Sequence, residues 1–493
     1  MILWFFCILA GLVVLGVPLF VIIGILTALA FTFFLPAEFN QFSDFLLLIE
    51  KIFELTDKNV LLAIPFFVLA GNIMTAGKMA ERQVNFARAM TGWLPGGLGI
   101  AAVLSCMFFA AISGSSPVTL IAIGSILYPA LIKEGYRANF SAGLLTCAGS
   151  LGILIPPSIP MLIYCIMVGS AVTIAVGDLF LAGVLPGLLI GILLMIYGLI
   201  EGKRFHYPIV PFSYKRVWES LKEGVWSLLL PVIVLGGIYG GIFTPTEAAA
   251  VSVVYATAVE AFIHRQLEWG RLKDLLTEAA VMVGAIYIIL VLALSLNEFF
   301  VQKQIAEQLL NWIKTLQLGP VTFLLGLNGL FLIVGCFMDS LSAIMILSPM
   351  LAPLGLKLGL DPIHLAIITI VNLEIGYLTP PIGINLFVAS SLFKMPVYQL
   401  FRTVIPFVLI MGGALLFLTY LPGLSIGPLN WLEGKKFWTP LVQERDRERL
   451  RAIRMDSSDS VFVEESQETK TEGSRVLSIK EMMDKVKKQK EVK

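Results

Sequence analysis

The sequence predicts an all-α protein that crosses a membrane many times. Of its 493 residues, 57% are hydrophobic and only 14% are charged, and the mean hydropathy is +0.88. A soluble globular protein carries about 25% charged residues. Apolar runs as long as the roughly 20 residues that a helix needs to cross the hydrocarbon core recur along the chain. These runs are continuous rather than alternating, which favours helices over the strands of a membrane barrel.

The apolar runs define the candidate membrane segments. They cover roughly 1–35, 58–76, 94–132, 138–171, 179–200, 225–263, 277–300, 320–355, 362–393 and 401–422. Several are too long for one crossing, so they must contain hairpins, broken helices or two spans. The first run has no basic residue at its start and is longer than the apolar region of a signal peptide. We therefore interpret it as a retained membrane span.

Polar stretches divide the chain into regions. The bridge KRFHYPIVPFSYKRVWESLKEG (203–224) separates two membrane regions, 1–202 and 225–425. It is the short loop richest in Lys and Arg, which favours the cytoplasm for this loop. HRQLEWGRLKDLLTE (264–278) is typical of an amphipathic surface helix. Residues 426–493 carry both charge signs and predict a soluble, partly disordered tail.

Charge and cysteine usage point to no other class of partner. The formal net charge is +1, which gives no reason to expect nucleic acid. All five cysteines lie in apolar runs without a CxxC pair, so we interpret them as small apolar side chains rather than metal ligands. The lipid bilayer is the partner that the composition predicts.

An internal repeat relates the two membrane regions. SLGILIPPSIP (150–160) matches EIGYLTPPIGIN (374–385) at a displacement of 224 residues, with Gly and both prolines aligned. The same displacement places YPALIKEGY (128–136) on APLGLKLGL (352–360). Matches in the same order indicate two homologous halves. The repeat alone leaves parallel and inverted halves open. We expect inverted halves, which follow if each half has an odd number of crossings.

Each half contains two irregular points inside apolar sequence. A re-entrant hairpin is predicted near 113–117 and near 337–343, and a helix broken by Pro-Pro near 150–158 and near 374–385. Irregular backbone at membrane depth is tolerated only where protein or a watery cavity surrounds it. Breaks at corresponding positions of two halves indicate a secondary transporter whose site lies between the halves.

The predicted breaks offer ligands of both signs. A break frees carbonyl oxygens at the end of one half-helix and N–H groups at the start of the next. Carbonyl, hydroxyl and carboxylate oxygens suit a hard cation such as Na⁺, whereas the N–H groups and the positive helix end suit an anionic substrate. Each half therefore offers a cation site, and a substrate can lie between the hairpin tips.

Four segments resemble one transporter family. They are GSSPVTLIAIGSILYPALIKEGY, LGILIPPSIP, GGIFTPTEAAAVSVVYA (240–256) and LEIGYLTPPIGINLFV. They are similar to the large membrane subunit (DctM type) of the tripartite ATP-independent periplasmic, or TRAP, transporters, over about residues 1–425. The tail beyond about residue 430 is not part of the usual pattern.

The resemblance implies a function and partners. It implies an elevator-type, Na⁺-coupled importer of the ion transporter superfamily, in the cytoplasmic (inner) membrane of a bacterium or archaeon. The partners would be a small four-helix membrane subunit and a periplasmic binding protein. The cargo would be a small organic anion, such as a C4-dicarboxylate or a sugar acid. Neither ATP nor an organic cofactor is implied, and the chain would not be an enzyme.

The resemblance also implies site residues. The first Na⁺ site would use Ser113, Ser115, Gly152, Ile155 and Pro157, and the second Asp339, Gly376, Thr379 and Ile382. The repeat supports this assignment, because Ser115, Gly152 and Ile155 align with Asp339, Gly376 and Thr379. The substrate would contact Ser116, Ser158 and Asn385.

Simpler roles stay open for several of these residues. Asp339 could be an acid neutralised by a lysine, and the serines of the first tip could merely allow close helix packing. Glu374 aligns with Ser150, so symmetry does not require it, and a structural hydrogen bond is an equal reading. We interpret Glu247 as structural, with Thr244 or Thr246 as a helix cap.

Three other functions compete. A self-sufficient Na⁺/dicarboxylate carrier of the same superfamily would need no binding protein. An intramembrane hydrolase would need a serine of the GSS motif beside His364 as its base, but His364 follows Asp-Pro and is expected near the surface. An ATP-driven permease would need an ATPase partner, because the chain contains no GxxxxGK[ST] motif.

Overall fold

A computed structural model describes residues 19–34, 59–169, 171–267, 269–304, 307, 308, 311, 319–380 and 383–442. The chain divides into two compact units, Met1–Leu441 and Val442–Lys493. The description below concerns the first unit. The predicted tail beyond residue 442 and the first part of the predicted N-terminal span lie outside the described residues.

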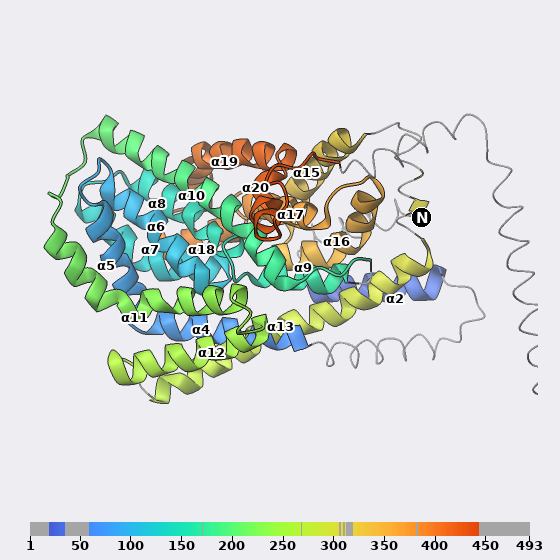
Figure 1. The fold of residues 1–493 in the computed structure, drawn as a ribbon, viewed down its shortest axis with the longest axis horizontal. Coiled ribbons are helices and arrows are strands. Elements are labelled where there is room, and N and C mark those ends of the chain that lie inside the picture. The colour runs from blue at the N-terminus through green and yellow to red at the C-terminus, as the bar shows by residue number, and fades with distance from the viewer. Residues whose placement is uncertain are drawn as a thin grey trace, which may run out of the picture. The chain divides into compact units, whose positions relative to one another are not determined.

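The described part of the chain is helical and contains no strand (Figure 1). Nine of its helices are long and apolar enough to cross a membrane. They span 59–76, 116–133, 176–205, 214–239, 245–263, 270–302, 320–337, 340–357 and 397–420. The predicted all-α, multi-pass class is therefore confirmed.

The helices of the first membrane region come in the order α2 to α10. Their bounds are α2 Leu19–Phe34, α4 Ala63–Ala76, α5 Met79–Thr91, α6 Gly97–Ser113, α7 Ser116–Lys133, α8 Ala138–Ser150, α9 Ile159–Val168 and α10 Val176–Phe205. The bridge is formed by the end of α10, an extended stretch over 207–213 and the first turns of α11, where the Ser213 hydroxyl accepts a hydrogen bond from the N–H of Arg216.

The second membrane region runs from α11 to α20. Its helices are α11 Tyr214–Tyr239, α12 Pro245–Ala258, α13 Trp269–Gln302, α15 Pro320–Phe337, α16 Ser340–Lys357, α17 Pro362–Gly376, α18 Ile384–Phe393, α19 Val397–Tyr420 and α20 Gly423–Leu432. α20 packs on α10 and α17. The folded unit thus extends beyond residue 425, where the sequence placed the boundary of the tail.

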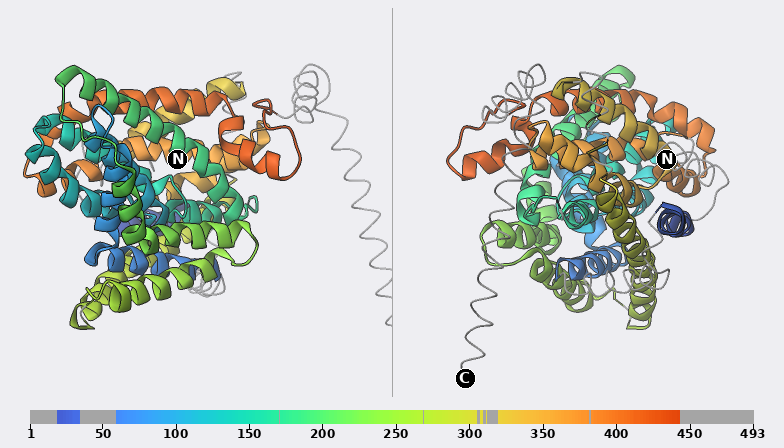
Figure 2. Two further views of the ribbon diagram at one scale, coloured as in Figure 1. Left: turned by 60° about the vertical axis from the view of Figure 1, so that its left-hand side comes forward. Right: turned by 90° about the vertical axis from the view of Figure 1, so that its right-hand side faces the viewer.

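The helices can be described as two groups, which are joined to each other where α5 packs on α6 and α13 packs on α16. In the first group α4 packs on α12 and α13, α13 packs on α2, and α11 packs on α5 and α12. Figure 1 shows α4, α11, α12 and α13 side by side along one side of this unit. The second group contains the short and broken helices, with α16 on α9, α18 on α7 and α10 on α20. Figure 2 shows the same helices from two further sides. The candidate site residues that the structure describes all belong to the second group.

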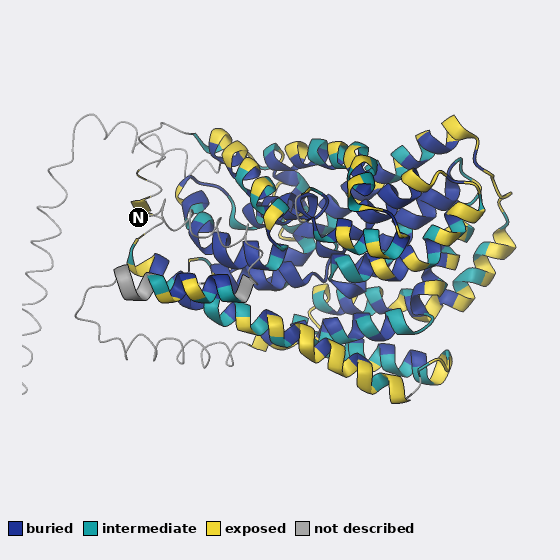
Figure 3. Ribbon diagram, turned by 180° about the vertical axis from the view of Figure 1, so that it is seen from behind, coloured by how far each residue is buried: buried dark blue, intermediate teal, exposed yellow. Residues whose placement is uncertain are grey.

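The outer helices expose apolar side chains, as expected of a surface that faces lipid (Figure 3). Val254 on α12, Val281 on α13, Ile333 on α15 and Leu409 on α19 are each more than 60% exposed. By contrast, α17 is buried along nearly its whole length, including the polar residue Glu374. Glu374, the ionisable residue of the second break, therefore lies inside protein and not against lipid.

Local sequence explains several helix boundaries. Thr244, not Thr246, caps α12, and Thr244 and Glu247 form a reciprocal capping box with N–H to side-chain oxygen distances of 3.3 and 2.8 Å. The expected surface helix at 264–278 is not separate. From Trp269 it forms the first turns of α13, because no proline interrupts the chain between Trp269 and Gln302.

His364 corrects a further expectation. It lies one turn into α17 as predicted, but it is 1% exposed, because α20 packs over this end of the helix. Its Nδ1 lies 2.6 Å from the Ser425 hydroxyl and its Nε2 lies 3.1 Å from the carbonyl oxygen of Thr419. Both ring nitrogens are thus engaged away from the GSS motif. The Ser–His pair that a hydrolase of the GSS type would need is not formed.

Candidate functional site

The first hairpin tip is built by the sequence Ser-Gly-Ser-Ser-Pro. α6 ends at Ser113, and Gly114 follows with φ = 60°, a conformation that glycine adopts without steric cost. Ser115 is the N-cap of α7, and Pro117 lies in the first turn, where its missing N–H is tolerated. The chain therefore reverses over two residues between two apolar helices.

Three oxygen atoms meet just behind this tip. The Ser113 hydroxyl lies 2.7 Å from the Thr119 hydroxyl, which donates a hydrogen bond of 2.9 Å to the carbonyl oxygen of Ser115. Gly152 lies against this cluster from the first broken helix. A Cβ atom at position 152 would lie 2.5 Å from the Ser115 oxygen and 2.6 Å from the Thr119 hydroxyl. Only glycine fits here without displacing the cluster.

The first broken helix is tied to the same tip. α8 ends at Ser150, a 3-10 turn follows, and α9 begins at Ile159, whose N–H donates to the carbonyl of Gly114 at 3.2 Å. A Cβ atom on Gly114 would lie 2.8 Å from the carbonyl oxygen of Pro157. Tip and break therefore touch through their main chains.

Two predicted residues of the first break make structural contacts. The side chain of Ile155 packs on Gly187 of α10, so only its main chain can serve a ligand. The Ser158 hydroxyl caps α9 by accepting from the N–H of Met161 at 3.4 Å, and it donates to the carbonyl of Ile153 at 2.5 Å. These contacts span the non-helical segment and hold its ends together.

The second hairpin tip carries a carboxylate in place of the serine. α15 ends at Phe337, and Asp339 is the N-cap of α16. Its Oδ2 accepts from the N–H of Ser342 at 3.1 Å, and its Oδ1 accepts from the Ser342 hydroxyl at 2.5 Å. Asp339 forms no ion pair with any lysine or arginine that the structure describes, and Lys357 pairs instead with Glu307 at 3.1 Å.

The second break also approaches its tip through glycine. Gly376, the last residue of α17, lies so near Gly335 that a Cβ atom on Gly376 would be 2.6 Å from the Cα of Gly335. The Thr379 hydroxyl donates to the carbonyl of Gly376 at 2.9 Å and also lies 2.9 Å from the Cys336 sulfur. The predicted ligand Ile382 lies outside the described residues.

Two of the polar contacts between the halves lie at the tips and breaks. Asn385, one residue into α18, donates from Nδ2 to the Ser116 hydroxyl at 2.6 Å, and both residues are fully buried. The Ser150 hydroxyl donates to Oε1 of Glu374 at 2.9 Å across the 224-residue displacement of the repeat. The predicted substrate residues Ser116 and Asn385 thus come together from different halves, whereas Ser158 contacts only its own half.

Sequence reasoning missed four members of these clusters. Thr119 joins the first oxygen cluster. At the second tip and break, Ser342 bonds to Asp339, Cys336 contacts Thr379, and Tyr377 contacts Ser340. Thr119 and Ser342 lie four and three residues after their tip residues. That spacing returns a side chain to the start of its helix, so it is a signal that could have found them.

A match to a protein family shows to which family this chain belongs. The family model of the tripartite ATP-independent periplasmic transporter, DctM component, matches residues 6–424. The chain belongs to this family. With nine candidate spans in its described part, it is a multi-pass protein of the inner membrane.

Individual relatives agree with this membership. The C4-dicarboxylate TRAP transporter large permease protein DctM of Pseudomonas aeruginosa is 44% identical over 383 residues, covering 78% of this chain and 89% of the relative. The protein of the same name from Vibrio cholerae is 40% identical, covering 87% and 96%. The 2,3-diketo-L-gulonate TRAP transporter large permease protein YiaN of Escherichia coli is 35% identical over 377 residues, covering 76% of this chain and 88% of the relative.

A solved structure shares the fold of this DctM family member. The YdaH transporter of Alcanivorax borkumensis aligns with a TM-score of 0.56 at 15% identity, covering 80% of this chain and 89% of that chain. At this identity the likeness concerns the architecture alone. It shows that the arrangement of helices is that of a known membrane transporter fold.

Proposed function

We propose that this chain is the large membrane subunit of a Na⁺-coupled importer for a small organic anion. The observation that carries the proposal is the presence of oxygen donors at both tips. Ser113, Ser115 and Thr119 lie against Gly152 of the first break, and Asp339 follows α15, the helix that Gly376 of the second break touches at Gly335. The clusters are small, rich in neutral and anionic oxygen, and placed inside protein at breaks in the helices. This is the donor chemistry that a hard monovalent cation requires.

The first proposed Na⁺ site uses neutral donors only. The hydroxyls of Ser113 and Thr119 and the carbonyl of Ser115 are already within hydrogen-bonding distance of one another. The main chains of Gly152, Ile155 and Pro157 would complete it. Glycine at 152 lets the broken helix approach the tip closely enough for its main-chain oxygens to contribute.

The second proposed Na⁺ site adds a formal negative charge. Asp339 supplies carboxylate oxygens at the tip, and Thr379 and the main chain of Gly376 supply oxygens at the break. Ile382 remains a predicted contributor. No described cation neutralises Asp339, so a bound Na⁺ would supply the missing positive charge.

The proposed substrate site lies at the contact between Ser116 and Asn385. Both belong to tips or breaks of different halves, and the amide and hydroxyl can turn to an anionic oxygen. Ser158 stays a predicted substrate contact. The names of the relatives favour a C4-dicarboxylate or a sugar acid as cargo. A periplasmic binding protein would deliver it, and a small four-helix membrane subunit would complete the transporter.

We further propose an elevator mechanism. The helices that carry the tips and breaks form the second group described above, and α2, α4, α5, α11, α12 and α13 form the first. Carrying the whole second group across the membrane relative to the first would move substrate and ions together. The proposed site would then keep its internal contacts, since they lie within one group.

Reconstituted uptake tests the proposed function. The purified chain, the small subunit and the binding protein are combined in vesicles, and uptake of a C4-dicarboxylate is measured with and without an inward Na⁺ gradient. We expect uptake only with all three proteins and the gradient. Uptake driven equally by K⁺ would contradict Na⁺ coupling, and full uptake by this chain alone would favour the self-sufficient carrier.

A further inference from the structure

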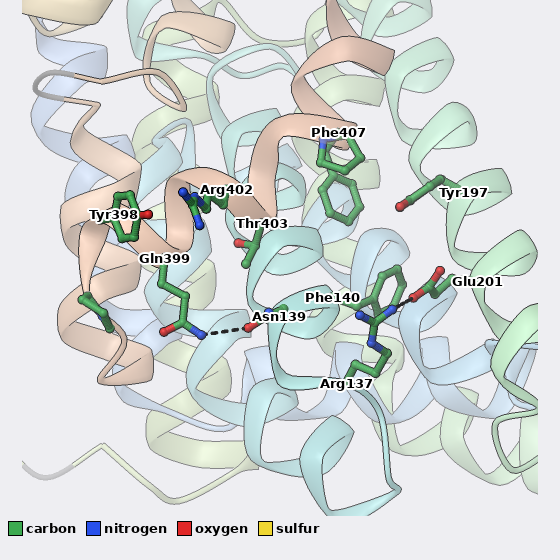
Figure 4. Close-up of a pocket in the computed structure, with 12 residues that line it drawn as sticks. Arg137, Asn139, Phe140, Tyr197, Glu201, Tyr398, Gln399, Arg402, Thr403 and Phe407 are labelled. Atoms are coloured by element: carbon green, nitrogen blue, oxygen red, sulfur yellow. Dashed lines mark hydrogen bonds and ion pairs between the residues drawn. The ribbon is translucent and has the colours of Figure 1, made fainter.

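A polar and aromatic pocket lies at the opposite end of α8 from the first break (Figure 4). It is formed by the first turns of α8 and α19 and the C-terminal half of α10, and its volume is about 630 Å³. α8 begins at Ala138 beside the pocket and ends at Ser150, a length of about 18 Å at 1.5 Å per residue. The pocket is therefore separate from the proposed transport site.

The pocket has an excess of positive charge. Arg137, Arg402 and Glu201 line it. Nη1 of Arg137 lies 3.3 Å from Oε1 of the buried Glu201, so this pair is nearly neutral. The Arg402 guanidinium lies over the ring of Tyr398 at 4.5 Å and forms no ion pair with any described residue. One exposed guanidinium thus stays available for an anion.

Neutral donors lie beside this guanidinium. Nε2 of Gln399 donates to Oδ1 of Asn139 at 3.0 Å and thereby links the first turns of α19 and α8, as Figure 4 shows. Neither helix has a side-chain cap, since Arg137 and Pro396 occupy the N-cap positions without such a bond. Two positive helix ends therefore add to the charge of Arg402.

The inner wall of the pocket is apolar. Phe140, Tyr197 and Phe407 form an aromatic cluster in which the Tyr197 and Phe407 rings meet edge to face at 4.9 Å. Beyond the pocket, α10 exposes Ile192 and Ile196 on its surface. A ligand with an anionic head and an apolar body matches the basic, aromatic and aliphatic surfaces that follow one another here. A small free anion would make no use of the aromatic wall.

The position of the pocket suits a lipid interface. Further basic residues, Lys133, Lys203, Arg204 and Lys394, lie at the same helix ends or in the adjoining turns. An excess of Lys and Arg in short loops marks the cytoplasmic side of a membrane protein. Anionic lipid headgroups attract basic side chains at this level of the bilayer.

We propose that this pocket binds the phosphate group of an anionic membrane phospholipid. Arg402 would hold the phosphate through its guanidinium, with Gln399 and Thr403 beside it, and the lipid chains would lie along the exposed apolar faces of α10 and α19. The inference does not depend on Na⁺ coupling or on the substrate. It concerns a site that transport chemistry leaves unused.

Lipid-dependent thermal stability tests the site. The purified chain in a neutral detergent is titrated with phosphatidylglycerol, phosphatidylcholine or inorganic phosphate, and the midpoint of thermal unfolding is followed. We expect phosphatidylglycerol to raise the midpoint of the wild type. Arg402→Gln should weaken this effect about tenfold, since a hydrogen bond to a charged group is lost. Lys215→Gln, which removes an equal charge from the exposed start of α11, should leave it unchanged.

A second variant and the two control ligands complete the test of the lipid site. Arg402→Lys keeps the charge, so it should retain part of the lipid effect even if Arg402→Gln folds poorly. Equal stabilisation of the wild type and Arg402→Gln by phosphatidylglycerol would overturn the site. Equal stabilisation by phosphatidylcholine would show that the phosphatidylglycerol charge is not recognised, and equal stabilisation by inorganic phosphate would show a free-anion site; either result overturns the lipid assignment.

Discussion

The two tip–break pairs share a backbone plan but differ in chemistry. At the first, Ser113, Ser115 and Thr119 offer hydroxyl and carbonyl oxygens and no formal charge. At the second, Asp339 brings a carboxylate, and Thr379 takes the place of Ile155 at the break. The repeat thus conserves the positions of the breaks within the chain, while the side chains at those positions differ between the halves.

The comparison also shows what the halves must keep in common. Gly152 and Gly376 each bring a broken helix into direct contact with a tip helix, and a Cβ atom would meet main-chain atoms at both positions. The contact between Ser150 and Glu374 joins residues that the repeat relates to each other. This contact is one of the places where the two membrane regions meet.

The largest expected effect is at the charged tip. Asp339→Ala should lower Na⁺-driven uptake on the order of 100-fold, because the second site loses its only formal charge and the N-cap of α16. Uptake in vesicles containing all three components measures this. Asp274→Ala, on the exposed start of α13, is the matched control. Undiminished Na⁺ dependence in Asp339→Ala would remove this residue from the site.

The glycine contacts come next. Gly152→Ala and Gly376→Ala should each lower uptake more than tenfold and destabilise the protein by about 1–3 kcal/mol, because the added methyl group overlaps main-chain atoms. Gly329→Ala in α15 has no atom within 4 Å of the new Cβ and serves as control. If one glycine variant transports normally, the two breaks do not share the close approach described above.

Single hydroxyl substitutions distinguish the first proposed Na⁺ site from the second. Thr119→Val keeps the side-chain shape but removes the donor to the Ser115 carbonyl, so the Na⁺ concentration for half-maximal uptake should rise about tenfold. Thr379→Val should act less strongly, since Asp339 remains. Thr257→Val in α12, where the hydroxyl bonds only to the preceding turn, is the control. A larger effect of Thr379→Val would reverse the proposed order.

The smallest effect is expected where the halves meet. Ser150→Ala removes the buried hydroxyl that contacts both Glu374 and the carbonyl of Cys147, and it should cost about 1 kcal/mol of stability, whereas Glu374→Gln keeps an acceptor and should cost less. Chemical denaturation of the purified variants measures both, with Glu278→Gln on α13 as control. The double variant should show coupling between the two changes, and strictly additive losses would argue that the hydrogen bond contributes nothing.

Much of the architecture could be predicted from periodicity and spacing. The apolar runs predicted a multi-pass helical protein, and the matched Gly and Pro-Pro positions predicted where helices end, because these residues act on the backbone locally. Two predictions were wrong, the separate surface helix at 264–278 and the exposed position of His364. The first failed because the polar turns from Trp269 continue without a break into the apolar part of α13. The second failed because α20 packs over the start of α17, which the sequence around His364 does not show.

The burial of Glu260 is another feature that the sequence does not predict. Nothing in the sequence around Glu260 distinguishes it from a residue at the polar end of a membrane segment. In the structure it is fully buried, and its Oε1 accepts from the N–H of Met79 at 2.8 Å, at the start of α5. Gly77 leaves room for this carboxylate, since a Cβ atom there would lie 2.0 Å from the carboxyl carbon.

The membrane class, the positions of the helix breaks and the family resemblance follow from the sequence alone. They are properties of composition and of local backbone chemistry, which a chain carries wherever it folds. Which oxygen atoms meet follows from the tertiary structure. Thr119 joins Ser113, Asn385 reaches Ser116, and Ser150 finds Glu374 because helices from different parts of the chain pack together. Side-chain partners across such distances follow from packing, which no single stretch of sequence encodes.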